Sequence, residues 1–513
     1  MFNSEQHSVI YSTFGLYLAL MLIIGFIGYK STKSLNDYIL GGRSLGAFVT
    51  GLSAGASDMS GWLLMGLPGA VFISGISEAW IAIGLIIGAY FNWKIVAQRL
   101  RIYTEHAGDS LTLPNFFAHR FNDENHHLRI ISSLVILIFF TIYCASGIVA
   151  GALLFSNMFE ISYQQALIIS VFATISYVFI GGFLAVSWTD TIQASLMVFA
   201  LVFTVISASV AIMNIDLSQI SATTNFHENS QNISGISSVL DLFNPSQLDL
   251  LTGTSVIGII SAMAWGLGYF GQPHILVRFM AAESAEKIPS ARRISMTWMI
   301  ICLAAAIIIG MVGIAYFRAF PELAQNVNKN SETIFLELAN HVLNPFLIGV
   351  IMAAILAAIM STLSCQLLVC SSSLTDDFYR TFLRPKASQT ELVWVGRFMV
   401  LLVSAIACYL SLDPNNKVLT MVSYAWAGFG ASFGSVILLS LFWHRMNKNG
   451  ALAGIIVGAT TVLLWKNLFA ETTGIYEIIP GFIFALIAAI WASLMSKSDE
   501  KVSIQHQEFL GKI

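Results

Sequence analysis

The stretch Ser53-Ala-Gly-Ala-Ser-Asp-Met-Ser-Gly-Trp62 places a carboxylate among small polar residues, inside an otherwise apolar run from about 45 to 75. A charge at the centre of a membrane-spanning helix costs about 2.5–3.5 kcal/mol, so a function is expected for it. Glycine and short hydroxyl residues around Asp58 are typical of a helix that unwinds and turns its backbone groups toward a ligand. The stretch predicts half of a site for a small solute and an ion. The alternative is that Asp58 only caps the N-terminus of a half-helix.

A second stretch, Ala357-Ala-Ile-Met-Ser-Thr-Leu-Ser364, carries neutral oxygens of the kind that hold a monovalent cation reversibly. Ala358, Ser361 and Thr362 stand at i, i+3 and i+4, on one face of a helix, and their small size lets a neighbouring backbone approach. Alternatively, both hydroxyls bond back to the preceding turn. The other ligands of a sodium shell would be backbone carbonyls of unwound chain, those of Ala56 and Met59.

Aromatic residues accompany a second interruption of an apolar run, in the segment 266–271. The segment Gly266-Leu-Gly-Tyr-Phe-Gly271 formally matches G-x-G-x-x-G, but a bilayer-length apolar run precedes it instead of a strand, which excludes a dinucleotide site. Trp265 and Tyr269 are spaced i, i+4, as expected on one face of a second broken helix; an aromatic packing stripe is the alternative. Tyr143 lies midway along another apolar run, and it too can be either a residue of a binding site or part of an aromatic packing stripe.

The elements that position these residues are membrane helices. The 513 residues are 56% hydrophobic and 10% charged, with mean hydropathy +0.76, too little polar surface for a soluble chain of this length. The net charge of −3 gives no basic excess that would suggest nucleic acid. The first apolar run lacks a cleavage site and is expected to be a retained helix. Thirteen spans are predicted, at about 11–29, 45–75, 78–98, 129–155, 163–183, 189–213, 253–271, 295–317, 343–375, 392–411, 418–443, 450–470 and 476–496.

The distribution of positive charge predicts the orientation. With the N-terminus outside and the C-terminus in the cytoplasm, all but four of the 25 Lys and Arg residues fall on the inner side. The long connection 214–251 contains no Lys or Arg and is expected outside. The segment Leu113–Arg120 predicts a short interfacial helix, and the polar segment 497–513 a mobile cytoplasmic tail. Asp58 is the only ionisable residue predicted deep in a span, whereas Asp190 is expected near a span end, within reach of water.

The two interruptions predict internal symmetry. They lie five spans apart, an odd number, so the second and seventh spans enter the membrane from opposite sides. This is the pattern of a five-plus-five inverted repeat whose broken helices face each other at the bilayer midplane. The prediction is one transporter domain over 1–513, with core repeats at about 45–213 and 253–443. A channel would need a continuous polar pore, and an enzyme a catalytic cluster of His, Cys or carboxylates; the spans offer neither.

Four motifs resemble those of the sodium:solute symporter family: Asp37-Tyr-Ile-Leu-Gly-Gly-Arg-Ser-Leu-Gly46, the Ser53–Trp62 stretch, Phe179-Ile-Gly-Gly-Phe-Leu-Ala-Val-Ser-Trp-Thr-Asp190 and Met360-Ser-Thr-Leu-Ser-Cys-Gln366. Two more, Trp265–His274 and Ser423–Gly430, are similar to those of a proline-transporting member, and the resemblance covers nearly the whole chain. It implies an all-α LeuT-type fold with thirteen transmembrane helices. It also implies sodium-coupled uptake of L-proline across a bacterial inner membrane, with Na⁺ as coupling ion and no other cofactor.

The resemblance also implies roles for single residues. The cation would be held by Ala56, Met59, Ala358, Ser361 and Thr362, with Asp58 linked to sodium. Proline would be bound by Ser60, Gly61, Tyr143, Trp265 and Tyr269. Arg43 and Asp190 match charged positions important for transport. A zwitterion with an apolar ring needs aromatic walls and exposed backbone dipoles, which Trp265, Tyr269 and the unwound Ser60–Gly61 can supply. The alternative is sodium symport of another small organic solute on the same scaffold.

Overall fold

A computed structural model describes residues 4–31, 34–215, 238–497 and 500–512. Every named element in this part of the chain is helical, and its one pairing of extended backbone is an isolated bridge between Leu45 and Ala282. The predicted all-α class is therefore confirmed. Residues 216–237 of the long connection 214–251 lie outside the described part.

The principal helices follow one another with short connections. In the first half of the chain they are α1 (Ser4–Ser31), α2 (Leu35–Leu40), α3 (Ala47–Asp58), α4 (Leu67–Ser74), α5 (Ala79–Phe91), α6 (Ala97–His106), α7 (Leu113–Arg120), α8 (His127–Phe159) and α9 (Tyr163–Met213). In the second half they are α10 (Val256–Met263), α11 (Pro273–Met280), α12 (Ile288–Ala319), α14 (Ile334–Val342), α15 (Pro345–Ser372), α16 (Gln389–Leu410), α17 (Val418–Phe429), α18 (Ser435–Phe442), α19 (Lys448–Leu468), α21 (Ile478–Met495) and α22 (Glu500–Leu510).

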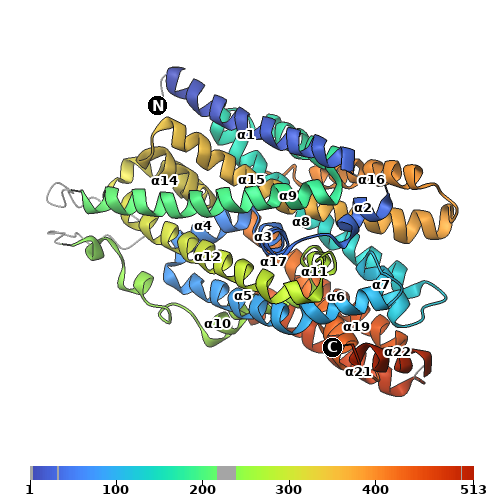
Figure 1. Ribbon diagram of the computed structural model, residues 1–513. Coiled ribbons are helices and arrows are strands. Elements are labelled where there is room, and N and C mark those ends of the chain that lie inside the picture. The colour runs from blue at the N-terminus through green and yellow to red at the C-terminus, as the bar shows by residue number, and fades with distance from the viewer. Residues whose placement is uncertain (1–3, 32–33, 216–237, 498–499, 513) are drawn as a thin grey trace.

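Ten helices of the described chain are long and apolar enough to cross a bilayer, and three shorter apolar helices accompany them. The chain is therefore a multi-pass membrane protein. In Figure 1, α9, α15, α12 and α5 run across the molecule, and the labels of α3, α11 and α17 lie among them. The interrupted segments thus occupy the interior of the bundle, where α3 has nine buried residues and α11 is buried along its whole length.

Two predicted spans follow each other without a loop, joined by a kink at Gly182. Helix α9 runs from Tyr163 to Met213 and includes both 163–183 and 189–213. Its only non-helical residue is Gly182, with φ 66° and ψ −173°, a backbone conformation that glycine adopts without steric cost. The boundary between the two predicted spans is therefore a bend at one residue.

The C-terminal segment differs from the mobile tail predicted from its composition. Residues 500–510 form α22, which packs against α6 and α7. Phe509 stacks on Tyr103 with ring centroids 3.9 Å apart, and Arg120 donates to the Val502 carbonyl oxygen at 3.3 Å. Burial, with the charge of Arg120 next in size, lowers the pKa of His506 to about 4, so the ring is neutral at pH 7. Apolar residues spaced like Val502 and Phe509 lie on one helical face, a signal that the polar composition hides.

Candidate functional site

The first broken helix unwinds where the sequence predicts. Helix α3 ends at Asp58, and Met59 has non-helical angles of φ −87° and ψ 86°. The chain restarts as a π-helical turn over Trp62–Gly66, and Ser60 joins the two parts because its side chain accepts from the Trp62 N–H at 3.3 Å. The unwound turn therefore comprises Met59 and Ser60, both fully or nearly fully buried.

The second interrupted helix is longer than predicted. Helix α10 gives way to a 3₁₀ stretch over Ala264–Gly271, the chain is extended at Gln272, and α11 then begins at Pro273. The helix predicted at 253–271 does end at Gly271, but a further helix was not expected from the sequence. Pro273 occupies the first turn of that helix, where a missing N–H costs nothing. Arg278, assigned from the sequence to an inner connection, consequently lies in this buried helix.

Four of the five predicted cation ligands meet where α3 packs against α15. The Ser361 hydroxyl donates to the Ala56 carbonyl oxygen at 2.8 Å and lies 3.0 Å from that of Ala358. The Thr362 hydroxyl donates to the same Ala56 oxygen at 3.2 Å. All four residues are buried. This convergence of neutral oxygens suits a monovalent cation, because a hydroxyl that now donates can turn a lone pair toward an ion. The fifth, Met59, is buried on the adjoining unwound turn.

Asp58 connects the two broken helices. The Tyr269 hydroxyl donates to one oxygen of its carboxylate, while the other oxygen is buried without a hydrogen-bond partner. The Asp58 backbone carbonyl accepts from the Trp62 indole at 3.1 Å and from the Tyr143 hydroxyl at 3.5 Å. The side chain of Asp58, two residues after Ala56, is thus held by the second broken helix through Tyr269. An orphaned buried oxygen of this kind is expected beside a bound cation.

Aromatic rings line the other side of the unwound turn. Trp265 lies 6.2 Å from Trp62 and 5.6 Å from Tyr476, measured between ring centroids. Trp426 donates from its indole to the Trp265 carbonyl oxygen at 2.7 Å and packs edge-on against Tyr269 at 5.1 Å. Trp426 thus ties α17 to the 3₁₀ stretch of the second broken helix.

Sequence reasoning missed Trp62, Trp426 and Tyr476 as members of the aromatic set. A Cβ at Gly268 would come within 1.9 Å of the Trp426 indole nitrogen, so a glycine is required where this side chain enters. The available signals were the tryptophan of the Ser423–Gly430 motif and the glycines of the 3₁₀ stretch. Their pairing depends on contacts more than 150 residues apart in sequence, such as the one between Trp426 and Trp265.

Gly61 faces a different neighbour from the one expected. From the sequence, a glycine at position 61 is expected to leave room for the apolar ring of the solute. In the structure, a Cβ at this position would lie 2.8 Å from the Cβ of Ala150 on α8. The glycine therefore allows the restarted helix to pack closely against α8, and contact with a solute is left to its backbone.

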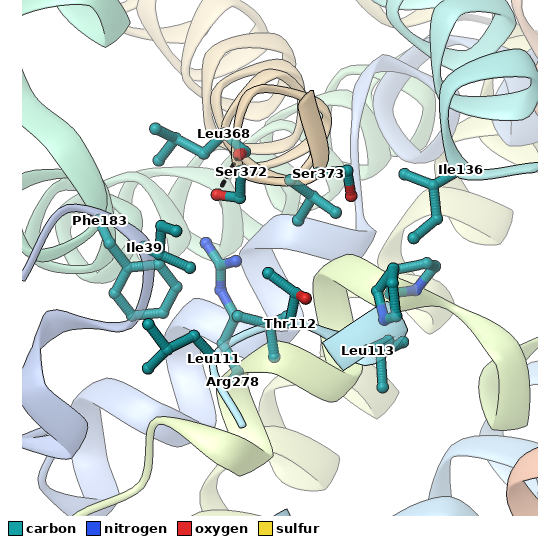
Figure 2. Close-up of a pocket in the computed structure, with 14 residues that line it drawn as sticks. Ile39, Leu111, Thr112, Leu113, Ile136, Phe183, Arg278, Leu368, Ser372 and Ser373 are labelled. Carbon is teal, nitrogen blue, oxygen red and sulfur yellow. Dashed lines mark hydrogen bonds between the residues drawn. The ribbon is translucent and has the colours of Figure 1, made fainter. Parts of the chain in front are cut away.

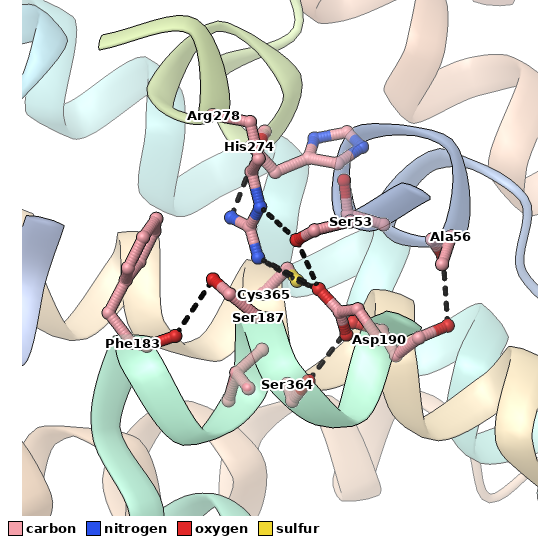
Figure 3. A network of polar contacts seen from close by, with 12 residues as sticks. Ser53, Ala56, Phe183, Ser187, Asp190, His274, Arg278, Ser364 and Cys365 are labelled. Atoms are coloured by element: carbon pink, nitrogen blue, oxygen red, sulfur yellow. Dashed lines mark hydrogen bonds and ion pairs between the residues drawn. The ribbon is translucent and has the colours of Figure 1, made fainter. Parts of the chain in front are cut away.

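Asp190 belongs to a buried ionic network instead of a water-accessible span end (Figure 3). It pairs with Arg278 at 3.4 Å and accepts from the Ser53 hydroxyl at 2.7 Å, and all three side chains are fully buried. The prediction that Asp58 is the only deeply placed charge is therefore wrong. The polar residues that compensate each other here come from α9, α11 and α3, which no local pattern connects.

Arg43 lies apart from both ligand groups, in the connection before α3. Its guanidinium donates to the Met280 carbonyl oxygen at 2.7 Å and to that of Ser110 at 3.0 Å, and it pairs with Asp109 at 2.9 Å. Met280 is the last residue of α11. Arg43 thus ties the beginning of one broken helix to the end of the other.

Comparison with known proteins agrees with this geometry. The model of the sodium:solute symporter family matches residues 38–458. A sodium/proline symporter of Escherichia coli is 58% identical over 489 residues, covering 95% of this chain and 93% of that protein. The chain belongs to the sodium:solute symporter family. Its members are symporters and not enzymes. A high-affinity proline transporter of Bacillus subtilis is 50% identical, covering 93% of this chain and 96% of that protein.

A solved structure gives the fold independently. A Na⁺-coupled sialic acid symporter in a substrate-bound, outward-open state superposes with a TM-score of 0.76 over 96% of this chain and 99% of that one, at 19% identity. A nucleobase-cation symporter in a closed conformation gives a TM-score of 0.53, with 92% and 98% covered, at 14% identity. The predicted transporter architecture is therefore confirmed at the level of the overall fold.

Proposed function

We propose that this family member couples the entry of Na⁺ to the uptake of L-proline by alternating access. The observation that carries the proposal is the single unwound turn at Met59–Ser60. The oxygen cluster of Ser361 contacts the chain just before this turn, at Ala56, and the aromatic set of Trp265 contacts it just after, at Trp62. Relatives of 58% and 50% identity that bear the name of proline transporters support L-proline as the solute. Sodium symport of another small organic solute is the alternative on the same scaffold.

In this proposal the carbonyls of Ala56, Met59 and Ala358 and the hydroxyls of Ser361 and Thr362 hold Na⁺. Asp58 supplies negative potential beside the ion without being one of its five ligands, and Tyr269 fixes its carboxylate by donating to one of the two oxygens. A cation bound by the carbonyl oxygens of Ala56 and Met59 stabilises the conformation of the unwound turn. Binding of sodium therefore lowers the cost of ordering the turn for the solute.

Proline meets the opposite side of the same turn. Its carboxylate accepts hydrogen bonds from backbone N–H groups at the start of the helix that resumes after Ser60 and Gly61. The positive end of the helix dipole lies there and favours a negative group. The apolar ring packs against Trp265, with Tyr143 and Tyr269 at the rim. Arg43 and Asp190, which contact neither group, act on the movement of the broken helices. No other cofactor is needed.

The architecture proposed around this site has thirteen transmembrane helices in one domain. The repeats cover about 45–213 and 253–443 and contain one broken helix each. The contact of Asp58 on α3 with Tyr269 on the 3₁₀ stretch before α11 supports an arrangement in which the two broken helices face each other. The protein lies in a bacterial inner membrane with its N-terminus outside and its C-terminus in the cytoplasm. One Na⁺ crossing about 100 mV contributes about 2.3 kcal/mol, enough for roughly 40-fold accumulation of the solute.

Uptake into proteoliposomes tests the proposal. An inward sodium gradient is expected to drive accumulation of labelled proline, and collapse of the gradient to abolish it. Asp58→Asn is expected to raise the sodium concentration for half-maximal uptake about tenfold or more, because a neutral amide no longer offsets the charge of the ion. Uptake indifferent to sodium would exclude coupling. Strong competition by another solute, with proline ineffective, would favour the alternative.

A further inference from the structure

Arg278 makes a set of buried contacts that no ligand-binding role requires. Its guanidinium is fully buried, donates to the Ser53 hydroxyl at 3.2 Å and pairs with Asp190 at 3.4 Å (Figure 3). It also contacts the thiol of Cys365 on α15 and covers the ring of Phe183 at 4.9 Å. One side chain thus connects α11 with α3, α9 and α15, and so holds both broken helices to the helices around them.

This network lies between the oxygen cluster and a small cavity. Along α15, the cluster residue Ser361 comes first, Cys365 at Arg278 follows one turn later, and Ser372 at the cavity follows about 10 Å beyond Cys365. The cavity has a volume of about 10 Å³, and Arg278 is one of its lining residues (Figure 2). Helix α3 gives the same order. Ser53, which contacts Arg278, precedes the cluster residue Ala56 by one turn, on the side where the helix begins.

The cavity contains polar atoms that are ready to receive a displaced guanidinium. The hydroxyl of Ser373 lines it and is buried without a hydrogen-bond partner. The neighbouring Ser372 donates to the Leu368 carbonyl oxygen at 2.7 Å, which leaves its lone pairs free to accept. One oxygen of Asp190 also lacks a partner. The ion pair of Arg278 and Asp190 thus leaves one carboxylate oxygen without a hydrogen bond. The cavity offers the guanidinium other polar partners, the hydroxyls of Ser372 and Ser373.

We propose that Arg278 is the inner gate of the transporter. While it is bound to Asp190 and Ser53 it separates the solute site from the cytoplasmic side, and its movement toward Ser372 and Ser373 opens the path. The pair can serve this purpose because a buried charge cannot leave its partner unless another polar environment is at hand. The inference rests on the proposed transport function and on the cytoplasmic orientation of the cavity.

Thiol labelling tests the gate without requiring transport. A Ser373→Cys reporter is reacted with a maleimide in inside-out vesicles, and labelling of the parent chain is subtracted. Removing the guanidinium with Arg278→Gln is expected to increase the labelling rate about tenfold or more, the population change that follows the loss of one charge-assisted hydrogen bond. The matched control is Arg293→Gln, at an exposed arginine of α12, which should leave the rate unchanged.

A second variant keeps the experiment decisive if Arg278→Gln alone fails to fold. Asp190→Asn together with Arg278→Gln removes both charges and leaves no unpaired ion. Faster labelling in this double variant supports the gate, and labelling at the rate of the unmodified reporter chain overturns it. The readout is independent of substrate, so a protein that transports a solute other than proline still answers the question. Conversely, sodium-driven proline uptake together with unchanged labelling would reject the gate alone.

Discussion

The hydroxyls of Ser361 and Thr362 both donate to one carbonyl oxygen, that of Ala56. Three oxygens thus approach one another from two helices, one of which stops two residues later at Asp58. In a continuous helix the Ala56 carbonyl would accept from the backbone four residues ahead. Unwinding releases it, and side-chain hydroxyls take that place. The hydroxyls of Ser361 and Thr362 therefore bind a carbonyl oxygen that the interruption of α3 after Asp58 releases from its helix.

Substitution of a single hydroxyl tests this arrangement. Ser361→Ala is expected to raise the sodium concentration for half-maximal uptake about tenfold, as for the loss of one hydrogen-bonding ligand, while the maximal rate stays close to that of the parent. Ser404→Ala is the matched control, since Ser404 is equally buried but donates to the Val400 carbonyl oxygen of its own helix. An equal shift in both variants would show that the hydroxyl of Ser361 acts through packing instead of the ion.

At the level of elements, the sequence predicts where helices break better than where they continue. The turn after Asp58 is signalled by glycine and serine neighbours, which act locally. Helix α11 was missed because the same proline signal that ends one helix also begins another. The pairing of Arg278 with Asp190 joins residues 88 positions apart, and the docking of α22 joins residues about 400 apart. Such contacts depend on tertiary packing, which local spacing does not encode.

Gly61 provides a test at the same scale. Gly61→Ala introduces a methyl group 2.8 Å from the Cβ of Ala150, an overpacking expected to cost about 1–3 kcal/mol of stability and to lower the midpoint of thermal unfolding of the purified protein. Adding Ala150→Gly is expected to restore most of the loss, because it removes the atom in conflict. If the glycine instead leaves room for a solute ring, stability stays near that of the parent, proline affinity falls, and the second substitution does not restore it.

For the whole molecule, the distribution of positive charge is the observation that predicts the orientation of the chain in the membrane. Arg318, Lys329, Lys417 and Lys466 are the four basic residues assigned to the outer side. The connection containing Lys417 joins α16 to α17, and the next connection, before α19, contains Arg445. Because α17 and α18 together make one crossing, these two connections should lie on opposite faces. The same direction applies to the gate, which opens to the cytoplasm only if α15 enters from outside.

Paired cysteine substitutions test this orientation. Asn415→Cys places a thiol at an exposed position in the connection before α17, and Asn449→Cys places one at an exposed position in the first turn of α19. Both are made in a background where the partly exposed Cys408 is replaced by serine. In intact cells, a membrane-impermeant maleimide is expected to label position 415 and not 449. In inside-out vesicles the pattern should reverse. Labelling of 449 in intact cells would invert the topology and place the cavity beside Ser372 on the outer side.

The grouping of indole rings has an optical consequence. Trp62 and Trp426 both lie within 6.4 Å of Trp265, so three of the 11 tryptophans of the chain gather at one site. Rings at this distance exchange excitation energy, and their shared emission depends on the polarity and water content of the space between them. The protein therefore carries its own fluorophore at the proposed site of a colourless, non-fluorescent solute. Emission can follow its arrival in real time, without a label and without transport.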